Sequence, residues 1–429
     1  MSNDQTLIDK NAADFARFVE DSPSSYHAAN ALVNRFKQGG FTEVTEVESW
    51  QSEPGSYVFS RDGAVLAWQI PDTTKKPQGF RIVGSHTDSP TFKVKPSGSS
   101  VTTDGWGQID VEVYGGMLTN SWLDRELGFA GRVVSDEGTQ VLVRTDAVAR
   151  IPQLAIHLDR GVNTNGLKLD NQRHLHPVWT LDKDLNFLDY VADQAGLGSQ
   201  KQILGHDLVA YVTQKPERFG NDKQFLASGR LDNLSSVHPA LVAFLDLDMS
   251  RHEDICVFVA FDHEEIGSAS RSGAAGPILE GTLRRLASLF DDSTQYYQQM
   301  IARSSCVSAD ASHGVHPNYS EYHDPQTHPI LGKGPVLKLN ANQRYATDAV
   351  GSALWNRACA SAEVPSQAFV SNNAIPCGST IGPITATRLG ITTVDVGIPI
   401  LSMHSAREMC HLADLHYLSR GLRSYWEAA

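Results

Sequence analysis

The chain begins with two segments in which apolar residues recur at helical spacing. Within residues 6–20, the apolar side chains that share this spacing are Leu7, Ile8, Phe15, Phe18 and Val19. Residues spaced in this way lie on one face of a helix. A second pattern follows Ser24-Ser25 and stops at Gly39-Gly40, as helices often do at glycine. The sequence therefore predicts two amphipathic helices.

Short apolar runs in the rest of the chain predict strands. Residues 57–59 and 64–68 flank Asp62-Gly63, which is typical of a β-hairpin. Residues 255–261 are apolar throughout, as expected of a strand covered on both faces. The other predicted strands are residues 81–84, 306–310, 336–339, 369–370 and 392–398.

Helical patterns alternate with these strands in the second half of the chain. They are predicted at residues 234–244, 277–289 and 385–388. Such alternation favours an α/β fold. The strand at residues 392–398 is the last one that the sequence predicts.

The pattern changes between residues 97 and 225, where short β-like runs are separated by glycines. We interpret residues 97–225 as an inserted β-rich domain. It divides an α/β domain into two parts, residues 1–96 and 226–429. A chain of 429 residues also favours two domains over one.

Composition and charge exclude several classes of protein. At 41% hydrophobic and 20% charged residues, the chain can build large cores. A formal net charge of −13 argues against binding to nucleic acid or to an anionic membrane surface. The five cysteines form no CxxC pair, which fits a reducing compartment. We expect no signal peptide and no membrane span of about 18 apolar residues, and hence a cytoplasmic protein.

The first candidate for chemistry is Asp262-His263-Glu264-Glu265, which directly follows the strand at residues 255–261. In α/β sheets, ligand sites lie just beyond the carboxyl ends of strands. Neighbouring carboxylates repel each other unless a positive group holds them. Two interpretations remain open from these residues: one acid binds a metal while its neighbour acts as a base, or both lie in a solvated turn.

Four further residues could complete a metal site with Glu265. They are His86, Asp232, Asp310 and His404. Two histidines and three carboxylates suit two adjacent divalent ions if one carboxylate bridges them. Imidazole and carboxylate ligands favour zinc, cobalt or manganese, and the absence of a thiolate set argues against a structural zinc.

Each candidate position also has a simpler structural interpretation. A histidine two residues before Asp88 is common in turns, although Asp88 could also hydrogen-bond the far ring nitrogen of His86. Asp232-Asn233 could cap a helix, and so could Asp310. With 16 histidines in the chain, some lie near acids by chance. Spacing alone therefore supports only a possible hydrolase site.

A set of motifs resembles the M18 family of metallo-aminopeptidases, the aspartyl aminopeptidases. The motifs occur in family order, from about residue 15 to residue 420: VGSHTDSP (83–90), GRLDNL (229–234), DHEEIGS (262–268), SAD (308–310), GVHPNY (314–319), NQRYA (342–346), CGSTIGP (377–383) and MHSARE (403–408). The resemblance implies a mixed-sheet peptidase domain sandwiched by helices, with a β-rich dimerisation domain inserted into it.

The resemblance also implies roles for the candidate ligands. Asp232 would bridge two divalent ions, most often zinc. Glu265 and His404 would complete the coordination of one ion. His86 and Asp310 would complete the coordination of the other. Cobalt and manganese remain alternative metals.

The same resemblance implies roles in catalysis and substrate binding. Glu264 would be the general base, and Asp88 would be a further catalytic residue, next to His86. His157 would reach the active site of a neighbouring subunit and stabilise the oxyanion, whereas the residues alone favour a histidine packed in a strand. Lys338 and Tyr345 would lie at the substrate pocket, where a cation favours an acidic first residue. The alternative for Lys338 is a strand lysine that faces solvent.

The resemblance predicts an enzyme that acts on peptides with a free N-terminus and forms dimers, and further a tetrahedral dodecamer. Some family members prefer neutral or apolar first residues, so that preference remains an alternative. A carboxypeptidase or N-acyl deacylase could use the same metal core, but would need an arginine for the substrate carboxylate. A non-enzymatic scaffold is disfavoured because the five ligands and Glu264 are all present.

Overall fold

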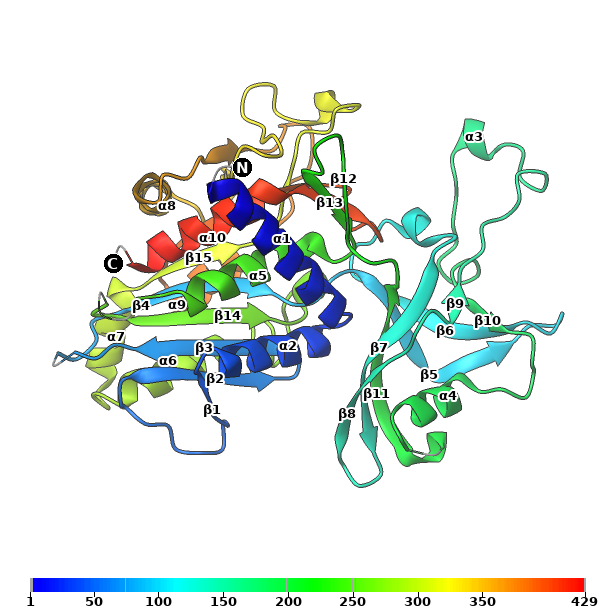
Figure 1. The fold of residues 1–429 in the computed structure, drawn as a ribbon, viewed down its shortest axis with the longest axis horizontal. Helices are drawn as coiled ribbons and strands as arrows, with labels where there is room; N and C mark the ends of the chain where they lie inside the picture. Colours follow the sequence, from blue (N-terminus) through cyan, green and yellow to red (C-terminus); the bar gives the residue numbers. More distant parts are fainter. Residues whose placement is uncertain (1–2, 74, 198, 249, 251, 428–429) are drawn as a thin grey trace.

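The structure, a computed structural model, describes residues 3–73, 75–197, 199–248, 250 and 252–427. Its largest sheet is mixed (Figure 1). The described strands of this sheet, in spatial order, are β1 (Thr42–Glu43), β2 (Gly55–Arg61), β3 (Ala64–Ile70), β14 (Ile255–Phe261), β4 (Phe80–His86), β15 (Ser305–Ala309), β19 (Thr392–Gly397), β17 (Val336–Lys338) and β18 (Gln367–Phe369).

Helices cover both faces of this sheet (Figure 1). One face carries α1 (Asn3–Asp21), α2 (Ser25–Gln38), α5 (Leu231–Leu245), α8 (Ala349–Ser361) and α10 (Leu412–Glu427). The other carries α6 (Ile278–Ser288), α7 (Thr294–Arg303) and α9 (Ile381–Leu389). Strand β14 supplies both cores, because Phe258 packs into the first and Val259 into the second. The predicted α/β fold with a helix-covered mixed sheet is confirmed.

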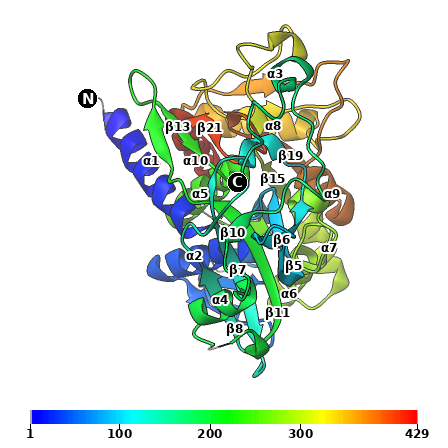
Figure 2. The ribbon, with the colours of Figure 1, turned by 90° about the vertical axis from the view of Figure 1, so that its right-hand side faces the viewer.

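A second sheet lies to one side of the first (Figures 1 and 2). Its described strands, in spatial order, are β11 (Ile203–Val212), β5 (Thr91–Val101), β6 (Gly107–Tyr114), β10 (Val178–Thr180), β9 (Ala149–Arg150), β7 (Glu126–Ser135) and β8 (Gln140–Arg144). Strand β11 also pairs with β7, so the sheet curves back on itself around a core that includes Phe92 and Phe129. The short helices α3 (Val162–Asn165) and α4 (Phe187–Gln194) belong to the same stretch of chain.

The strands of this second sheet all fall within residues 91–212. The division of the chain into domains at residues 97 and 225 stays a prediction, and so does a role of the inserted part in dimerisation.

A third sheet joins distant parts of the chain. Its described strands, in spatial order, are β12 (Glu217–Phe219), β13 (Phe225–Ser228), β21 (Glu408–His411), β20 (Pro399–Leu401) and β16 (Ser312–His313). The expectation that β19 is the last strand was wrong, because β20 and β21 follow it. Strands of three and four residues are too short to show a pattern of their own.

The first helices and the hairpin follow the predictions. Helix α2 begins after Ser24, whose Oγ accepts a hydrogen bond from the His27 backbone N–H, and Gly39 caps its end. Asp62, at the turn between β2 and β3, has a φ of 56°. The described 3₁₀ turns are η1 (Thr119–Trp122), η2 (Gln200–Gln202), η4 (Glu264–Ile266) and η5 (Ser320–Tyr322). In the part of the chain described, no helix has both the length and the apolar character needed to cross a membrane.

Candidate metal centre

Three adjacent parallel strands of the large sheet end at the same place. His86 is the last residue of β4 and pairs in register with Phe261, the last residue of β14. Strand β15 lies on the other side of β4, and Asp310 directly follows it. Turn η4, which carries Glu264 and Glu265, comes three residues after β14. The carboxyl ends of these strands therefore present His86, both glutamates and Asp310 to one region.

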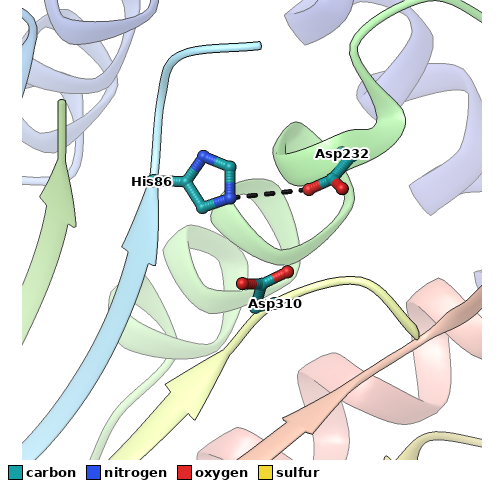
Figure 3. A group of neighbouring side chains, drawn as sticks. All are labelled: His86, Asp232 and Asp310. Atoms are coloured by element: carbon teal, nitrogen blue, oxygen red, sulfur yellow. Dashed lines mark ion pairs between the residues drawn. The ribbon is translucent and has the colours of Figure 1, made fainter. Parts of the chain in front are cut away.

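Asp232 reaches the same region from the start of α5 (Figure 3). Its backbone is not helical, with φ −80° and ψ 105°, and the Asp232–Asn233 peptide bond is cis. Its Oδ1 lies 3.5 Å from Nε2 of His86, and its Oδ2 lies 3.4 Å from Nε2 of His404. Regular helical backbone begins only after Asn233, so Asp232 lies just before the helix proper, as the helix-cap interpretation expected, while its carboxylate faces the two histidines.

His404 lies in the turn between β20 and β21, where its φ is 65°. Its Nε2 is 3.3 Å from Oε2 of Glu265, and its Nδ1 donates a hydrogen bond of 2.8 Å to the Gly116 carbonyl. The imidazole is therefore oriented from one side while its other nitrogen faces the two carboxylates.

The potential ligand atoms form overlapping groups, in each of which they lie within 4.8 Å of one another. The first group is His86, Asp232 and Asp310; the second is Asp232, Glu265 and His404; the third is His86, Glu264 and Glu265. Asp232 belongs to the first two groups, and each of its oxygens faces a different histidine. The five predicted ligands are thus brought together, and their assignment to ions stays a prediction.

Unpaired polar atoms show that a cation fits this position. Asp232 Oδ1 and Glu265 Oε1 are buried and have no hydrogen-bond partner among the described residues. A buried carboxylate oxygen without a partner is costly, at about 1–3 kcal/mol or more. Imidazole and carboxylate donors in this number match the preferences of zinc, cobalt and manganese. The residues present therefore fit a divalent metal.

The electrostatics of the group lead to the same conclusion. Burial raises the pKa of Glu264 to about 7 and raises the pKa of Glu265 well above its usual range. Burial also raises the pKa of Asp310, against the opposing effect of the Lys338 ammonium. Burial lowers the pKa of His404, but its contact with Asp232 outweighs this and raises it to about 9. These raised carboxylate pKa values reflect the burial of several acids in one place, an unfavourable arrangement that a bound divalent cation would offset.

The solvated-turn interpretation of the two glutamates is wrong. The Glu265 side chain is 4% exposed and that of Glu264 is 17% exposed. The Asp88 carboxylate holds their backbone, because it accepts hydrogen bonds from Glu264 N at 3.0 Å and Glu265 N at 3.2 Å. His86 donates from Nδ1 to the Asp88 carbonyl at 3.1 Å and lies 3.4 Å from the Asp88 carboxylate. Asp88 thus links two of the ligand segments.

Sequence reasoning missed the part that the second sheet plays in this site. Tyr114, the last residue of β6, donates a hydrogen bond of 2.7 Å to Oδ2 of Asp88, and Gly116 orients His404. Tyr114 follows Asp88 by 26 positions in the chain, and Gly116 precedes His404 by 288 positions. The only related pattern in the sequence is the alternating strand at residues 109–114, which two glycines follow. This pattern does not show which distant residues Tyr114 and Gly116 contact.

Lys338 is buried rather than exposed to solvent, so that interpretation was wrong. Its side chain is 2% exposed, and Nζ donates a hydrogen bond of 2.8 Å to the Ala311 carbonyl. The same nitrogen lies 3.6 Å from Oδ1 of Asp310 and 5.2 Å from the centroid of the Tyr345 ring. A cavity of about 1000 Å³ is lined by residues 339–344 and 370–377 among others, and its lining begins at the residue that follows Lys338 in the chain.

His157 lies in an exposed turn after β9, so a histidine packed in a strand was also wrong. Its apolar neighbours are exposed as well, with Leu154 at 61%, Ile156 at 46% and Leu158 at 74%. None of the ligand groups found within the described chain includes His157.

Comparison with known proteins identifies this arrangement. Residues 18–426 match the family described as aminopeptidase I zinc metalloprotease (M18). The chain belongs to the M18 family. A probable M18 family aminopeptidase 2 of Streptomyces avermitilis is 48% identical over 433 residues, which cover 100% of both chains. One from Streptomyces coelicolor is 46% identical over 418 residues, or 96% of each chain.

Solved structures of M18 proteins share this fold. In a cryo-EM structure of the Ape4 and Nbr1 complex, the matching chain is 34% identical, with a TM-score of 0.95 and coverage of 100% of this chain and 87% of that chain. The Saccharomyces cerevisiae mApe1 dodecamer is 28% identical, with a TM-score of 0.86 and coverage of 99% and 98%. The M18 protein described here is therefore a metallo-aminopeptidase, and its cofactor is a divalent metal.

Proposed function

We propose that the enzyme uses two adjacent divalent ions, zinc by the family description, to remove an acidic N-terminal residue from peptides. The observation that supports two ions most strongly is the position of Asp232. One of its oxygens faces His86 in a group with Asp310, and the other faces His404 in a group with Glu265. A carboxylate shared in this way suits ions about 3.5–4 Å apart. Cobalt and manganese are the alternative metals.

The bound ions would supply a water of lowered pKa and would polarise the scissile carbonyl. Glu264 would accept a proton from that water and deliver it to the leaving amine. Its position supports this role, because Oε2 lies 4.0 Å from Nε2 of His86, at the edge of the ligand set. A pKa raised to about 7 by burial also suits a group that gains and loses a proton near neutral pH. Asp88 would keep Glu264 and Glu265 in place through their backbone N–H groups.

The preference for an acidic first residue is supported by a buried cation beside the candidate metal centre. Lys338 is the buried cation next to Asp310, and its neighbour Tyr345 is 5% exposed. An ammonium in a site with little water attracts a substrate carboxylate strongly. Asp310 lies 3.6 Å from the ammonium and neutralises part of its charge. A preference for neutral or apolar first residues therefore remains the alternative.

The exposed loop at residues 154–158 supports an oligomer. Its leucine and isoleucine side chains are largely uncovered, which is typical of protein contact surfaces. The mApe1 relative forms a dodecamer. We infer that the chain forms a homo-oligomer in which the inserted part docks on a second copy, and that His157 serves the partner subunit's site. Dimer and tetrahedral dodecamer, as well as a cytoplasmic location, stay predictions.

A kinetic panel tests the proposal. Metal-free protein is reloaded with zinc, cobalt or manganese and assayed on the p-nitroanilides of Asp, Glu, Leu and Lys. The expected result is cleavage of Asp and Glu substrates with a kcat/KM at least tenfold above that of Leu, and loss of activity on chelation. A peptide blocked at its N-terminus should resist. Trimming of that blocked peptide from its C-terminus, or release of its acyl group, would favour a carboxypeptidase or a deacylase.

A further inference from the structure

One buried carboxylate contacts both turns that carry Asp232 and His404. It belongs to Glu408, the first residue of β21, which is 2% exposed. Its Oε2 accepts hydrogen bonds from Leu231 N at 2.6 Å and from Asp232 N at 3.1 Å. Its Oε1 accepts one from His404 N at 2.8 Å. A single side chain therefore joins two ligand segments that are 172 positions apart in the chain (404 minus 232).

The third sheet explains why Glu408 can reach both turns. Strands β13 and β21 are antiparallel neighbours, and Glu408 lies opposite Ser228, the last residue of β13. The chain then leaves β13 directly into the turn that carries Asp232. On the other side, His404 lies four residues before Glu408. The pairing of two short strands thus places the carboxylate between the turns.

The turns need such support because their backbones are unusual. Arg230, before Asp232, has a φ of 60°, and His404 has a φ of 65°. Residues other than glycine adopt this left-handed conformation rarely, and the surrounding structure must hold them in it. The backbone N–H groups of Leu231, Asp232 and His404 donate hydrogen bonds to Glu408, and without it they would be buried without this partner.

We propose that Glu408 is a positioning residue for the ion held by Asp232, Glu265 and His404. This rests on the proposed two-ion site. Asp88 supports the segments of His86 and the two glutamates, and Lys338 contacts Asp310. Glu408 gives the same support to the two remaining ligands. Loss of groups that orient metal ligands typically weakens metal binding by about 10–100-fold.

The test compares Glu408→Gln with a matched control, Asp414→Asn. Asp414 is also a buried carboxylate that accepts two backbone hydrogen bonds, from Gly332 and Gly334, but neither belongs to a ligand turn. Metal-free protein is titrated with zinc against a chelating dye, and its Tm is measured without metal. We expect Glu408→Gln to weaken the binding of one zinc at least tenfold. Asp414→Asn should keep the wild-type zinc affinities even if its Tm falls as much as that of Glu408→Gln.

Wild-type zinc affinities in Glu408→Gln, or an equal loss in Asp414→Asn, would overturn the assignment. If Glu408→Gln does not fold, the test uses Glu408→Asp instead. The shorter side chain keeps the charge but cannot reach both turns. Wild-type zinc affinities in Glu408→Asp would equally overturn the assignment. A wild-type protein that binds a single zinc contradicts the two-ion proposal instead, and Glu408 is then judged on the affinity of that zinc.

Discussion

Glu264 and Glu265 are neighbours in the chain but lie in different surroundings. Glu265 is 4% exposed and lies 3.3 Å from the His404 imidazole. Glu264 is 17% exposed and is 4.0 Å from the nearest imidazole nitrogen, that of His86. A ligating carboxylate has its lone pairs occupied, whereas a free one can accept a proton. The difference supports Glu265 as the ligand and Glu264 as the base.

The first prediction concerns Glu264→Gln. The amide has the same shape but cannot accept a proton, so kcat should fall by roughly 10²–10⁴-fold. Zinc content, measured by atomic emission, should remain that of the wild type. Glu253→Gln is the control, because its side chain is 67% exposed and lies outside the site. Wild-type turnover in Glu264→Gln would remove Glu264 from the base role.

The second prediction concerns Lys338→Met, with the exposed Lys333→Met as its control. If Lys338 attracts an acidic first residue, the ratio of kcat/KM for Asp- and Leu-p-nitroanilide should fall about tenfold or more, which corresponds to about 1.4 kcal/mol. Lys333→Met should keep the ratio. An equal loss on both substrates would mean that Lys338 serves only to position Asp310.

At the residue scale, the sequence predicted the site residues that can be recognised from their residue type and their place at the end of a strand. His86, Asp310 and the two glutamates follow apolar strands, so their convergence could be expected. Tyr114 and Glu408 could not be found in this way, because each acts through a partner that is distant in the chain. The solvent-facing alternative for Lys338 stayed open in the sequence because β17 has only three residues, which give no indication of a covered face.

At the scale of single elements, the start of α2 carries an unusual histidine. Burial, together with the charges of Arg144 and Arg230, lowers the pKa of His27 from its ordinary value of 6.5 to about 4. Its Nδ1 lies 2.8 Å from Oγ of Ser24, the residue that caps the helix. The folded protein therefore keeps the His27 imidazole neutral in a pH range where the same imidazole binds a proton in the unfolded chain.

The third prediction follows from this shift. Between pH 6.5 and 4 the unfolded state takes up a proton at His27 that the folded state refuses, so the free energy of unfolding falls as the pH falls. One group contributes at most about 1.4 kcal/mol per pH unit. In urea titrations across this range, His27→Gln should show a shallower fall in the free energy of unfolding than the wild type. Equal slopes in wild type and His27→Gln would contradict the assignment.

The elements that the sequence predicted are those with enough residues to show a period. Helix α2 and the hairpin of β2 and β3 carry their own start, turn and stop signals. Strands β20 and β21 have three and four residues and depend on β13 and β16 for their pairing. Helix α10 does carry apolar residues at helical spacing, including Leu415, Leu418 and Leu422, so this signal was present but not used.

At the scale of the whole molecule, parts of all three sheets meet at the candidate metal centre. Strand β6 of the second sheet supplies the Tyr114 hydroxyl, and the bend after it supplies the Gly116 carbonyl, while the exposed loop after β9 carries His157. The change in pattern along the chain predicted a β-rich insertion. It could not predict that the insertion borders the site, because that contact depends on tertiary packing.

The fourth prediction tests whether His157 serves a neighbouring subunit. Glu264→Gln and His157→Ala chains should each be nearly inactive. Co-expressed at equal levels, they should form mixed dimers in which one site has an intact Glu264 from one chain and His157 from the other. Random pairing in symmetric dimers should restore about a quarter of wild-type activity. Activity no higher than that of the two variants alone would mean that His157 acts within its own chain or not at all.

The most direct measurement is anomalous diffraction at the zinc edge from crystals grown with zinc. Two peaks, about 3.5–4 Å apart on either side of the Asp232 carboxylate, are the predicted result. One should lie among Asp232, Glu265 and His404, and the other among His86, Asp232 and Asp310. A single peak, or peaks away from Asp232 in crystals of active enzyme, would contradict a two-ion aminopeptidase.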